Sequence, residues 1–312
     1  MENTFWIWYP GDFELYHAMK QNFSRVERGF GWPAFWKSEG FRNRVAFRRT
    51  YELKQETSFT VFSNAIGHVL VTRENGEKKY PFGKKITVAP GKVRISIHAG
   101  CVEAFPCAYV QGEVIHSDKT WKAEDYSQPL VPVGVCKYFT KPGQNPTVWE
   151  YTEKECKPVK ISEINGGVLA EFETELTAAV YVNDKRQKSS GVEVFCGESM
   201  DEALDLEHCY YSWQPDPVTN RCPCCAVRFA FIPNCKAEAV EITAFYQYVD
   251  FPKRASFKCS DKKLNKIWEV AEHTFRLCSG IFFLDGVKRD KWIWSGDAYQ
   301  SFFVNQYLLA DP

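Results

Sequence analysis

Apolar and polar residues alternate with period two along the chain from about Arg44 to Ile97. In the first run, apolar side chains alternate with polar or small ones, as is typical of a half-buried β-strand: Val45, Phe47, Tyr51 and Leu53. Similar short runs follow at 59–62, 68–72 and 93–97, and the dipeptide Asn75-Gly76 favours the tight turn of a hairpin. Strands this short, with turn signals this frequent, predict an antiparallel β-sandwich rather than strand–helix–strand units.

The same alternation returns between about Gly134 and Tyr248. Apolar residues at 168, 172, 176, 178, 180 and 182 share one face of a predicted strand, and Glu171, Glu173, Glu175 and Thr177 take the other face. The polar stretch 117–128 is the best boundary between the two β regions. We therefore expect two antiparallel β-sandwich domains, at residues 1–125 and 126–255.

The period changes to that of a helix after Ser256. Five residues fall on one face of an α-helix, at i, i+3, i+4, i+7 and i+11: Leu264, Ile267, Trp268, Ala271 and Phe275. Ser260 is a suitable N-cap for this helix. A second helix is predicted to start near Ser295 and to carry Tyr299, Phe302, Phe303 and Tyr307. Residues 256–312 are thus expected to begin a helical domain.

Charge and composition narrow the class of partner. Lys plus Arg and Asp plus Glu number 39 each, so electrostatics gives no case for nucleic acid or for an acidic membrane surface. The sequence shows no signal peptide and no apolar run long enough to span a membrane. Most of the 12 cysteines stand singly in strand-like runs, where a thiol behaves as a small apolar side chain. We therefore expect reduced thiols and a cytoplasmic location. The 10 tryptophans fit either a sugar-binding surface or an aromatic-rich core.

Two groups of residues invite a sharper interpretation. The run Cys222-Pro-Cys224-Cys225 has no second pair of ligands at the short spacing that zinc sites use. Free thiols are therefore favoured over a disulfide and over a zinc site. No metal and no cofactor is predicted. Four N-terminal tryptophans could form a sugar-binding platform, although aromatic packing between domains is the favoured interpretation: Trp6, Trp8, Trp32 and Trp36.

The segment from Asp285 to Asp297 combines carboxylates with basic and indole side chains: Asp285, Lys288, Arg289, Asp290, Lys291, Trp292, Trp294 and Asp297. Glycoside hydrolysis needs one protonated carboxyl that donates to the leaving oxygen, and a second carboxylate that activates a water or attacks the sugar. Indole walls and neighbouring charges can keep one carboxyl protonated near neutral pH. A solvated charged loop with tryptophan anchors would have the same composition, and spacing alone favours that loop over a catalytic site, because acidic and basic residues are common in loops.

The chain resembles bacterial α-L-rhamnosidases, in which β-sandwich domains precede a six-hairpin α/α barrel. The resemblance is sharpest over 282–297, Phe-Phe-Leu-Asp-Gly-Val-Lys-Arg-Asp-Lys-Trp-Ile-Trp-Ser-Gly-Asp, and weaker at 45–51, at Gly197–Ala203 and at 227–232. It implies a mainly β chain: two antiparallel β-sandwich domains followed, at 256–312, by the first helices of a truncated α/α six-hairpin barrel.

Carried over residue by residue, the resemblance assigns a role to each part of this segment. Asp290 falls on the general-acid position, although the family's acid is usually Glu, which is one methylene longer. The other matched positions hold the sugar or line its subsite: Asp285, Arg289, Trp292, Trp294 and Asp297.

The resemblance further implies inverting hydrolysis of terminal α-L-rhamnose from glycosides or polysaccharides, with a water-activating base expected beyond Pro312. Residues 256–312 are too few for twelve helices, so the 312-residue chain alone is expected to be an inactive N-terminal portion. The expected partner is a rhamnose-containing glycan or glycoside; no nucleic acid or membrane is expected, and a homodimer is left open. Two alternatives remain: a six-hairpin glycosidase for another sugar, and a non-catalytic carbohydrate-binding fragment.

Overall fold

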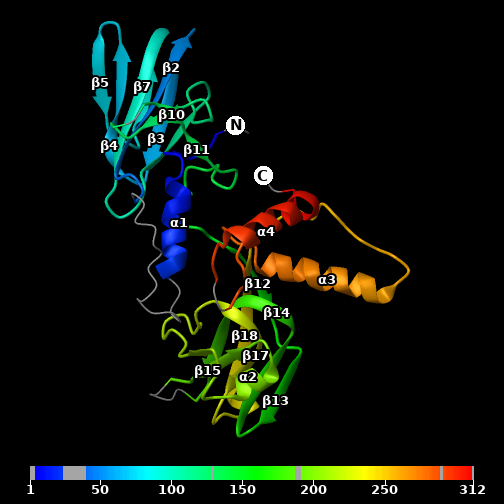
Figure 1. The fold of residues 1–312 in the computed structure, drawn as a ribbon. Helices are drawn as coiled ribbons and strands as arrows, with labels where there is room; N and C mark the ends of the chain where they lie inside the picture. Colours follow the sequence, from blue (N-terminus) through cyan, green and yellow to red (C-terminus); the bar gives the residue numbers. More distant parts are fainter. Residues whose placement is uncertain (1–3, 24–39, 128, 187–190, 289–290, 311–312) are drawn as a thin grey trace. The chain divides into compact units, whose positions relative to one another are not determined.

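The computed structural model describes residues 4–23, 40–127, 129–186, 191–288 and 291–310, which divide into two compact units (Figure 1). The first unit is Met1–Trp149 and the second is Glu150–Pro312. Each unit is described below by itself.

The described residues of the first unit form two antiparallel sheets and one α-helix. Its elements are β1 (Ile7–Trp8), α1 (Asp12–Phe23), β2 (Arg44–Leu53), β3 (Thr57–Ser63), β4 (Ile66–Arg73), β5 (Gly76–Tyr80), β6 (Lys85–Val88), β7 (Gly91–Gly100), β8 (Cys107–Gly112), β9 (Lys122–Glu124), β10 (Val131–Pro132) and β11 (Gly134–Val135). Among the described residues, one sheet has the order β11-β1-β8-β3-β6 and the other has the order β10-β9-β2-β7-β4-β5.

The alternating pattern of β2 produces the first core. Val45 and Phe47 are fully buried, whereas Arg48 on the other face forms an ion pair with Glu124 of β9 at 2.8 Å. Inward residues of both sheets join one apolar cluster, so the predicted first sandwich is confirmed. Hairpin β4–β5 lies where the sequence placed it, although its two turn residues are Glu74 and Asn75, because Arg73 already pairs with Gly76.

Two of the four tryptophans near the N-terminus, Trp6 and Trp8, belong to the interior of the first unit. Trp6 and Trp8 are 3% and 2% exposed, and Trp8 packs on Phe13 of α1 with ring centroids 5.0 Å apart. A sugar-binding platform made from these two indoles is therefore wrong, because aromatic packing within the first unit covers both rings. Trp32 and Trp36 lie outside the described residues.

The last strands of the first unit lie beyond the boundary predicted after residue 125. β10 pairs with β9, and β11 pairs with β1 at the opposite end of the sequence of this unit. These pairings hold residues 131–135 in the first sandwich, and the compact unit accordingly runs to Trp149. The division into three domains, at 1–125, 126–255 and 256–312, stays a prediction.

Over its described residues, the second unit is built on one antiparallel sheet with the order β12-β18-β14-β17-β15-β16, in which β13 also pairs with β14. Its elements are β12 (Thr152–Cys156), β13 (Lys160–Ile164), β14 (Gly167–Asp184), β15 (Val194–Gly197), α2 (Met200–Leu204), β16 (Tyr211–Trp213), β17 (Cys225–Ile232), the 3₁₀ turn η2 (Ala237–Ala239), β18 (Val240–Tyr248), α3 (Lys262–Leu277) and α4 (Ser295–Leu308).

The long strand β14 changes partners along its length. Its first part pairs with β13 and β17, and its second part pairs with β17 and β18. The register against β17 shifts between Glu171 and Leu176, as at a β-bulge, and a bulge of this kind bends a strand. Residues on both sides of the shift, such as Val168 and Val180, contribute to one buried cluster.

Helix α3 forms where the sequence period predicted it, but with a different cap. The side chain of Asp261 accepts hydrogen bonds from the backbone N–H groups of Lys263 at 2.7 Å and Leu264 at 3.4 Å. The prediction that Ser260 caps this helix is therefore wrong, because the carboxylate one residue later reaches two free N–H groups of the first turn. The predicted start of the second helix near Ser295 is confirmed.

The described residues thus form a mainly β protein with antiparallel sheets and two later helices, as predicted. None of the helices within the described ranges has both the length and the apolar character that a membrane span requires.

Candidate functional site

The segment that carries the candidate chemistry is closed at its two ends by Asp285 and Trp292. The backbone N–H of Asp285 donates to the carbonyl of Trp292 at 3.0 Å, and the backbone N–H of Trp292 donates to Oδ1 of Asp285 at 2.8 Å. Lys291 adopts φ of 47°, a left-handed conformation that costs a non-glycine residue about 1 kcal/mol or more. These bonds join the two ends of the segment 285–292, which is called the acidic loop below.

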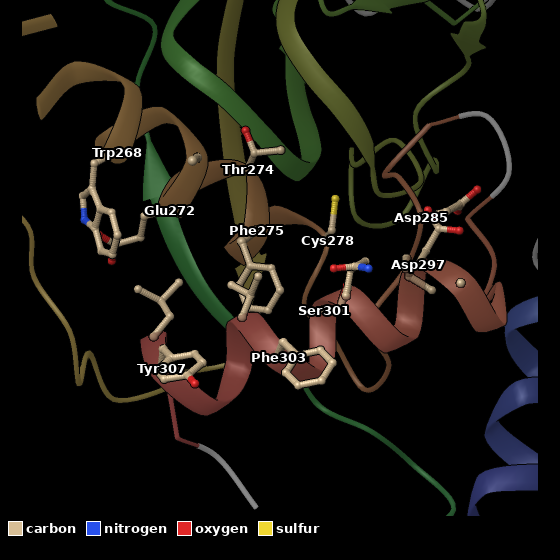
Figure 2. Close-up of a pocket in the computed structure, with 16 residues that line it drawn as sticks. Trp268, Glu272, Thr274, Phe275, Cys278, Asp285, Asp297, Ser301, Phe303 and Tyr307 are labelled. Atoms are coloured by element: carbon tan, nitrogen blue, oxygen red, sulfur yellow. The ribbon is translucent and has the colours of Figure 1, made fainter. Parts of the chain in front are cut away.

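Asp285 and Asp297 line the same cavity, which has a volume of about 930 Å³. The cavity lies between α3, α4 and the segment that joins them, and its remaining wall is largely apolar, including Trp268, Phe275 and Tyr307. Figure 2 shows the two aspartates together at one end of the cavity, with Trp268 and Tyr307 toward the other end. Two carboxylates at one end of a largely apolar cavity can accept hydrogen bonds from hydroxyl or ammonium groups of a bound ligand.

The position of Asp297 follows from the start of α4. Trp294 is the N-cap residue and makes no side-chain capping bond, and Asp297 lies in the first turn of the helix. The positive end of the helix dipole favours an ionised carboxylate there. Asp297 is exposed, so its carboxylate is open to solvent and to a ligand.

Lys288 ties the acidic loop to the sheet of the second unit. Its Nζ donates to Oε2 of Glu198 at 3.1 Å and to Oε1 of Glu202, and its backbone carbonyl accepts from the hydroxyl of Tyr211 at 3.2 Å. Lys291 adds a cation–π contact, with Nζ 5.0 Å from the centre of the Tyr211 ring. The acidic loop is therefore held by both side-chain and main-chain bonds of Lys288.

The two glutamates that bind Lys288 are placed by the short helix α2. Ser199 is its N-cap and accepts from the N–H of Glu202 at 3.2 Å, while Oε2 of Glu202 accepts from the N–H of Glu198 at 3.1 Å. This is close to a capping box, which fixes the side chain of Glu202 and the backbone of Glu198 at the helix start. Gly197 precedes them, and a Cβ there would lie 2.8 Å from the nitrogen of Ala203, so the turn needs glycine.

Glu175 adds a third carboxyl beside this group. Burial, followed by a hydrogen bond and charge repulsion from Glu198, raises the pKa of Glu175 from 4.5 to about 7, against the opposing effects of Lys288 and Arg228. Burial, with the charges of Asp285 and Glu175, raises the pKa of the Cys278 thiol to about 11. Cys278 also lines the cavity, and its thiol is protonated at neutral pH and hence a poor nucleophile.

The structure brings together only part of the predicted site. Asp285 and Asp297 share the cavity; Trp292 is 7% exposed and acts as a closing residue of the acidic loop; Trp294 is 44% exposed. Arg289 and Asp290 lie outside the described residues, and their roles stay predictions. The sugar contacts assigned to the other four residues stay predictions as well.

Sequence reasoning missed the contact of Lys288 with Glu198 and Glu202, and it missed Glu175. The contact joins two segments that each carried the resemblance, 197–203 and 282–297, but nothing in their spacing indicates that they touch. The sequence contains one weak sign of an irregularity next to Glu175. Thr174 is a polar residue on the otherwise apolar face of its strand, and it lies where the register of β14 against β17 shifts.

Replacing Lys288 with Gln is expected to lower the free energy of unfolding by about 1–2 kcal/mol at neutral pH, because Glu198 and Glu202 lose their shared cation while both are partly buried. Urea unfolding measures the change. Lys291→Gln, which removes a lysine from the same loop but only a cation–π contact, is the matched control and should cost no more than about 1 kcal/mol. Equal losses in the two variants would contradict the bond assigned to Lys288.

The cysteine run of this unit consists of free thiols. Burial, and then the neighbouring Cys225, raises the pKa of Cys222 and of Cys224 to about 12 in each case. Within the described ranges, no group of three or more histidine, cysteine or acidic residues is arranged to hold a metal ion.

A family model described as "Alpha-rhamnosidase-like, bacteroidetes, N-terminal" matches residues 45–212, more than half of the chain. No sequence among the curated proteins matches the chain.

Solved structures with a similar arrangement include the α-L-rhamnosidase from Dictyoglumus thermophilum, at 14% sequence identity and a TM-score of 0.40. The Streptomyces avermitilis α-L-rhamnosidase complexed with L-rhamnose has 10% identity and a TM-score of 0.34, and a Pleurotus ostreatus lectin in complex with GalNAc has 10% and 0.29. The matches cover 85%, 81% and 80% of this chain. They span 39% and 33% of the two rhamnosidase chains and 75% of the lectin.

Proposed function

The chain belongs to the family of alpha-rhamnosidase-like N-terminal regions, and from this premise we propose that it is the N-terminal portion of an inverting α-L-rhamnosidase. The observation that carries the proposal is the shared cavity of Asp285 and Asp297, two carboxylates that the resemblance assigns to sugar binding. In the proposed reaction, both accept hydrogen bonds from hydroxyls of a terminal rhamnose.

Asp290 is proposed as the general acid, which protonates the glycosidic oxygen as the bond to the anomeric carbon breaks. A water on the opposite face of the sugar attacks that carbon, and a base from a later part of the protein takes the proton of the water. In an inverting enzyme the acid and base carboxyls lie about 6.5–9.5 Å apart, which leaves room for the water. The acidic loop, tied to the sheet through Lys288, supplies the acid side of this arrangement.

The apolar faces of α3 and α4 support the view that further helices complete the catalytic domain. Large apolar side chains on α3 are half exposed, and those on α4 are exposed to a similar or greater degree: Leu264, Ile267, Val270, Tyr299, Phe302 and Tyr307. Exposed apolar patches of this kind mark surfaces that another element covers. We propose that downstream helices of the same protein cover them and provide the base. The chain with those helices is called the full-length protein below.

Hydrolysis of an aryl α-L-rhamnoside tests the proposal. The full-length protein should release the phenol, and the 312-residue chain should release none above the uncatalysed rate, because it lacks the proposed base. Coding sequence downstream should continue for several hundred codons with helical hairpins and a glutamate in the base position. Turnover by the 312-residue chain alone would refute the proposal that the base lies in a later part of the protein. Turnover of another aryl glycoside but not the rhamnoside would favour a different sugar, and no turnover of any would favour a non-catalytic role.

A further inference from the structure

A second cavity, with a volume of about 620 Å³, belongs to the first unit. It lies where β7 pairs with both β2 and β4, and the segment after β9 completes its wall. The residues that give this wall its shape and polar groups are Arg44, Gly67, His68, His98, Asp125 and Tyr126. None of them lines the cavity of the second unit, and the proposed hydrolysis uses none of them.

Three rings form a stacked row on the wall of this cavity. His68 of β4 lies directly opposite His98 of β7, and their ring centroids are 5.1 Å apart with the planes inclined by 14°. Tyr126 continues the row with its ring centroid 6.1 Å from that of His98, and its hydroxyl forms a hydrogen bond with Nδ1 of His98 at 2.7 Å. Tyr126 is 53% exposed, so much of its ring is open to a ligand.

The backbone holds this row in place without a ligand. Gly67 approaches β7 so closely that a Cβ would lie 1.9 Å from the carbonyl oxygen of His98, so only glycine fits there. Tyr126 adopts a left-handed φ of 67°, which is costly for a residue other than glycine and persists only where its surroundings hold it. A wall that is already ordered loses less conformational entropy when a ligand binds.

The charged groups of the wall differ in how open they are to a ligand. The side chain of Asp125 is 11% exposed, and its carboxylate already accepts from Nε of Arg42 at 3.4 Å and from the backbone N–H of Ser127 at 3.1 Å. Arg44 is exposed and has no ion pair with any residue that the structure describes. A ligand in the cavity therefore meets an available guanidinium group, which can bind a carboxylate through two parallel hydrogen bonds.

The two imidazoles add polar groups without adding charge. Burial, and then the charge of Lys79, lowers the pKa of His68; burial, and then the charges of His68 and Arg48, lowers the pKa of His98. Both rings are therefore largely neutral at pH 7, where each offers one N–H donor and one acceptor nitrogen. Groups of this kind exchange hydrogen bonds with hydroxyls, which both donate and accept.

We propose that this cavity is a binding site for an acidic sugar, a hexuronate residue of a glycan chain. Arg44 binds the carboxylate of the sugar, and His68 and His98 exchange hydrogen bonds with its hydroxyls. Tyr126 packs against the sugar ring, because a phenol combines apolar surface with a polar hydroxyl. The volume of the cavity lies within the range of about 300–1,000 Å³ that is usual for ligand pockets.

NMR of the histidine rings in the 312-residue chain tests the proposal, because only two of the six histidines line this cavity. The probes are the methyl glycosides of D-glucuronate and D-galacturonate, whose anomeric oxygen is substituted as in a glycan chain. Their methyl esters are the matched controls, since they keep the ring and hydroxyls and lose the charge. We expect at least one uronate to shift the signals of His68 and His98 alone, and its ester to bind about tenfold more weakly.

Arg44→Gln should weaken binding of the uronate about tenfold and leave binding of the ester unchanged, because the amide can donate but carries no charge. Arg94→Gln is the matched control: Arg94 is an exposed arginine on β7 of the same sheet, but it does not line this cavity, and the variant should bind as the wild type does.

Three results with the wild-type chain would overturn the proposal, whether or not a variant folds. They are equal binding of acid and ester, shifts at histidines other than His68 and His98, and no shift with either uronate. Undiminished uronate binding by a folded Arg44→Gln chain would overturn it as well. None of these measurements involves hydrolysis, so the proposed function is tested separately.

Discussion

Replacing Asp290 with Asn in the full-length protein is expected to lower kcat for a rhamnoside with a poor leaving group by about 10²–10⁴-fold. The reason is that an amide cannot donate the proton that the departing oxygen needs. The measurement is the initial rate of hydrolysis at saturating substrate. Unchanged turnover would remove Asp290 from the acid role.

Substrates with different leaving groups distinguish a general acid from a residue that only maintains the structure of the site. A dinitrophenyl rhamnoside departs without protonation, so the loss caused by Asp290→Asn should shrink to a small factor on this substrate. Asp290→Glu is the matched control, because it keeps the carboxyl and restores the methylene that is usual in the family; it should retain turnover on both substrates. An equal loss on both substrates in Asp290→Asn would indicate that the variant disturbs binding or folding instead.

Replacing Trp292 with Ala is expected to lower the free energy of unfolding of the second unit by about 3 kcal/mol or more. The indole is 7% exposed, and its removal leaves a cavity that the surroundings fill only in part. Loss of the indole should also weaken the hydrogen bond between the N–H of Trp292 and the carboxylate of Asp285, which lines the cavity. We therefore expect a ligand in the cavity to bind less tightly to this variant. Urea unfolding measures the first effect.

Trp294 provides the control for this prediction. It lies two residues further along, is 44% exposed, and caps α4 only through its backbone. Trp294→Ala should therefore change stability by less than about 1 kcal/mol. Equal stability of the two variants would contradict the view that burial of the Trp292 indole stabilises the acidic loop.

Regular patterns in the sequence predicted many of the regular elements, although helices α1 and α2 were not among them. Strand β2 follows the alternation around Phe47, and α3 and α4 begin within two residues of where the period and the Ser295 signal placed them. These features are local, since a strand or helix face depends on residues a few positions apart. The cap of α3 was misplaced by one residue, because Ser260 and Asp261 are both good capping residues and only the geometry distinguishes them.

Contacts between distant segments were not predictable from the same patterns. β11 completes a sheet with β1, and Lys288 binds Glu198 and Glu202 about ninety residues away; neither pairing leaves a periodic trace in the sequence. The interior position of Trp8 also depends on tertiary packing, because an indole suits a core as well as a sugar-binding surface. The resemblance correctly indicated the family, which the family model matches over residues 45–212, whereas the segment 282–297, where the resemblance was sharpest, lies outside that match.

The anomeric form of the first product tests the central claim most directly. The full-length protein is mixed with an aryl α-L-rhamnoside, and ¹H NMR follows the anomeric protons from the first minute, before mutarotation mixes the anomers. Inverting hydrolysis, with one acid on the acidic loop and a base elsewhere, predicts that β-L-rhamnose appears first and the α-anomer later. Initial release of α-L-rhamnose, or release of no rhamnose at all, would contradict the account.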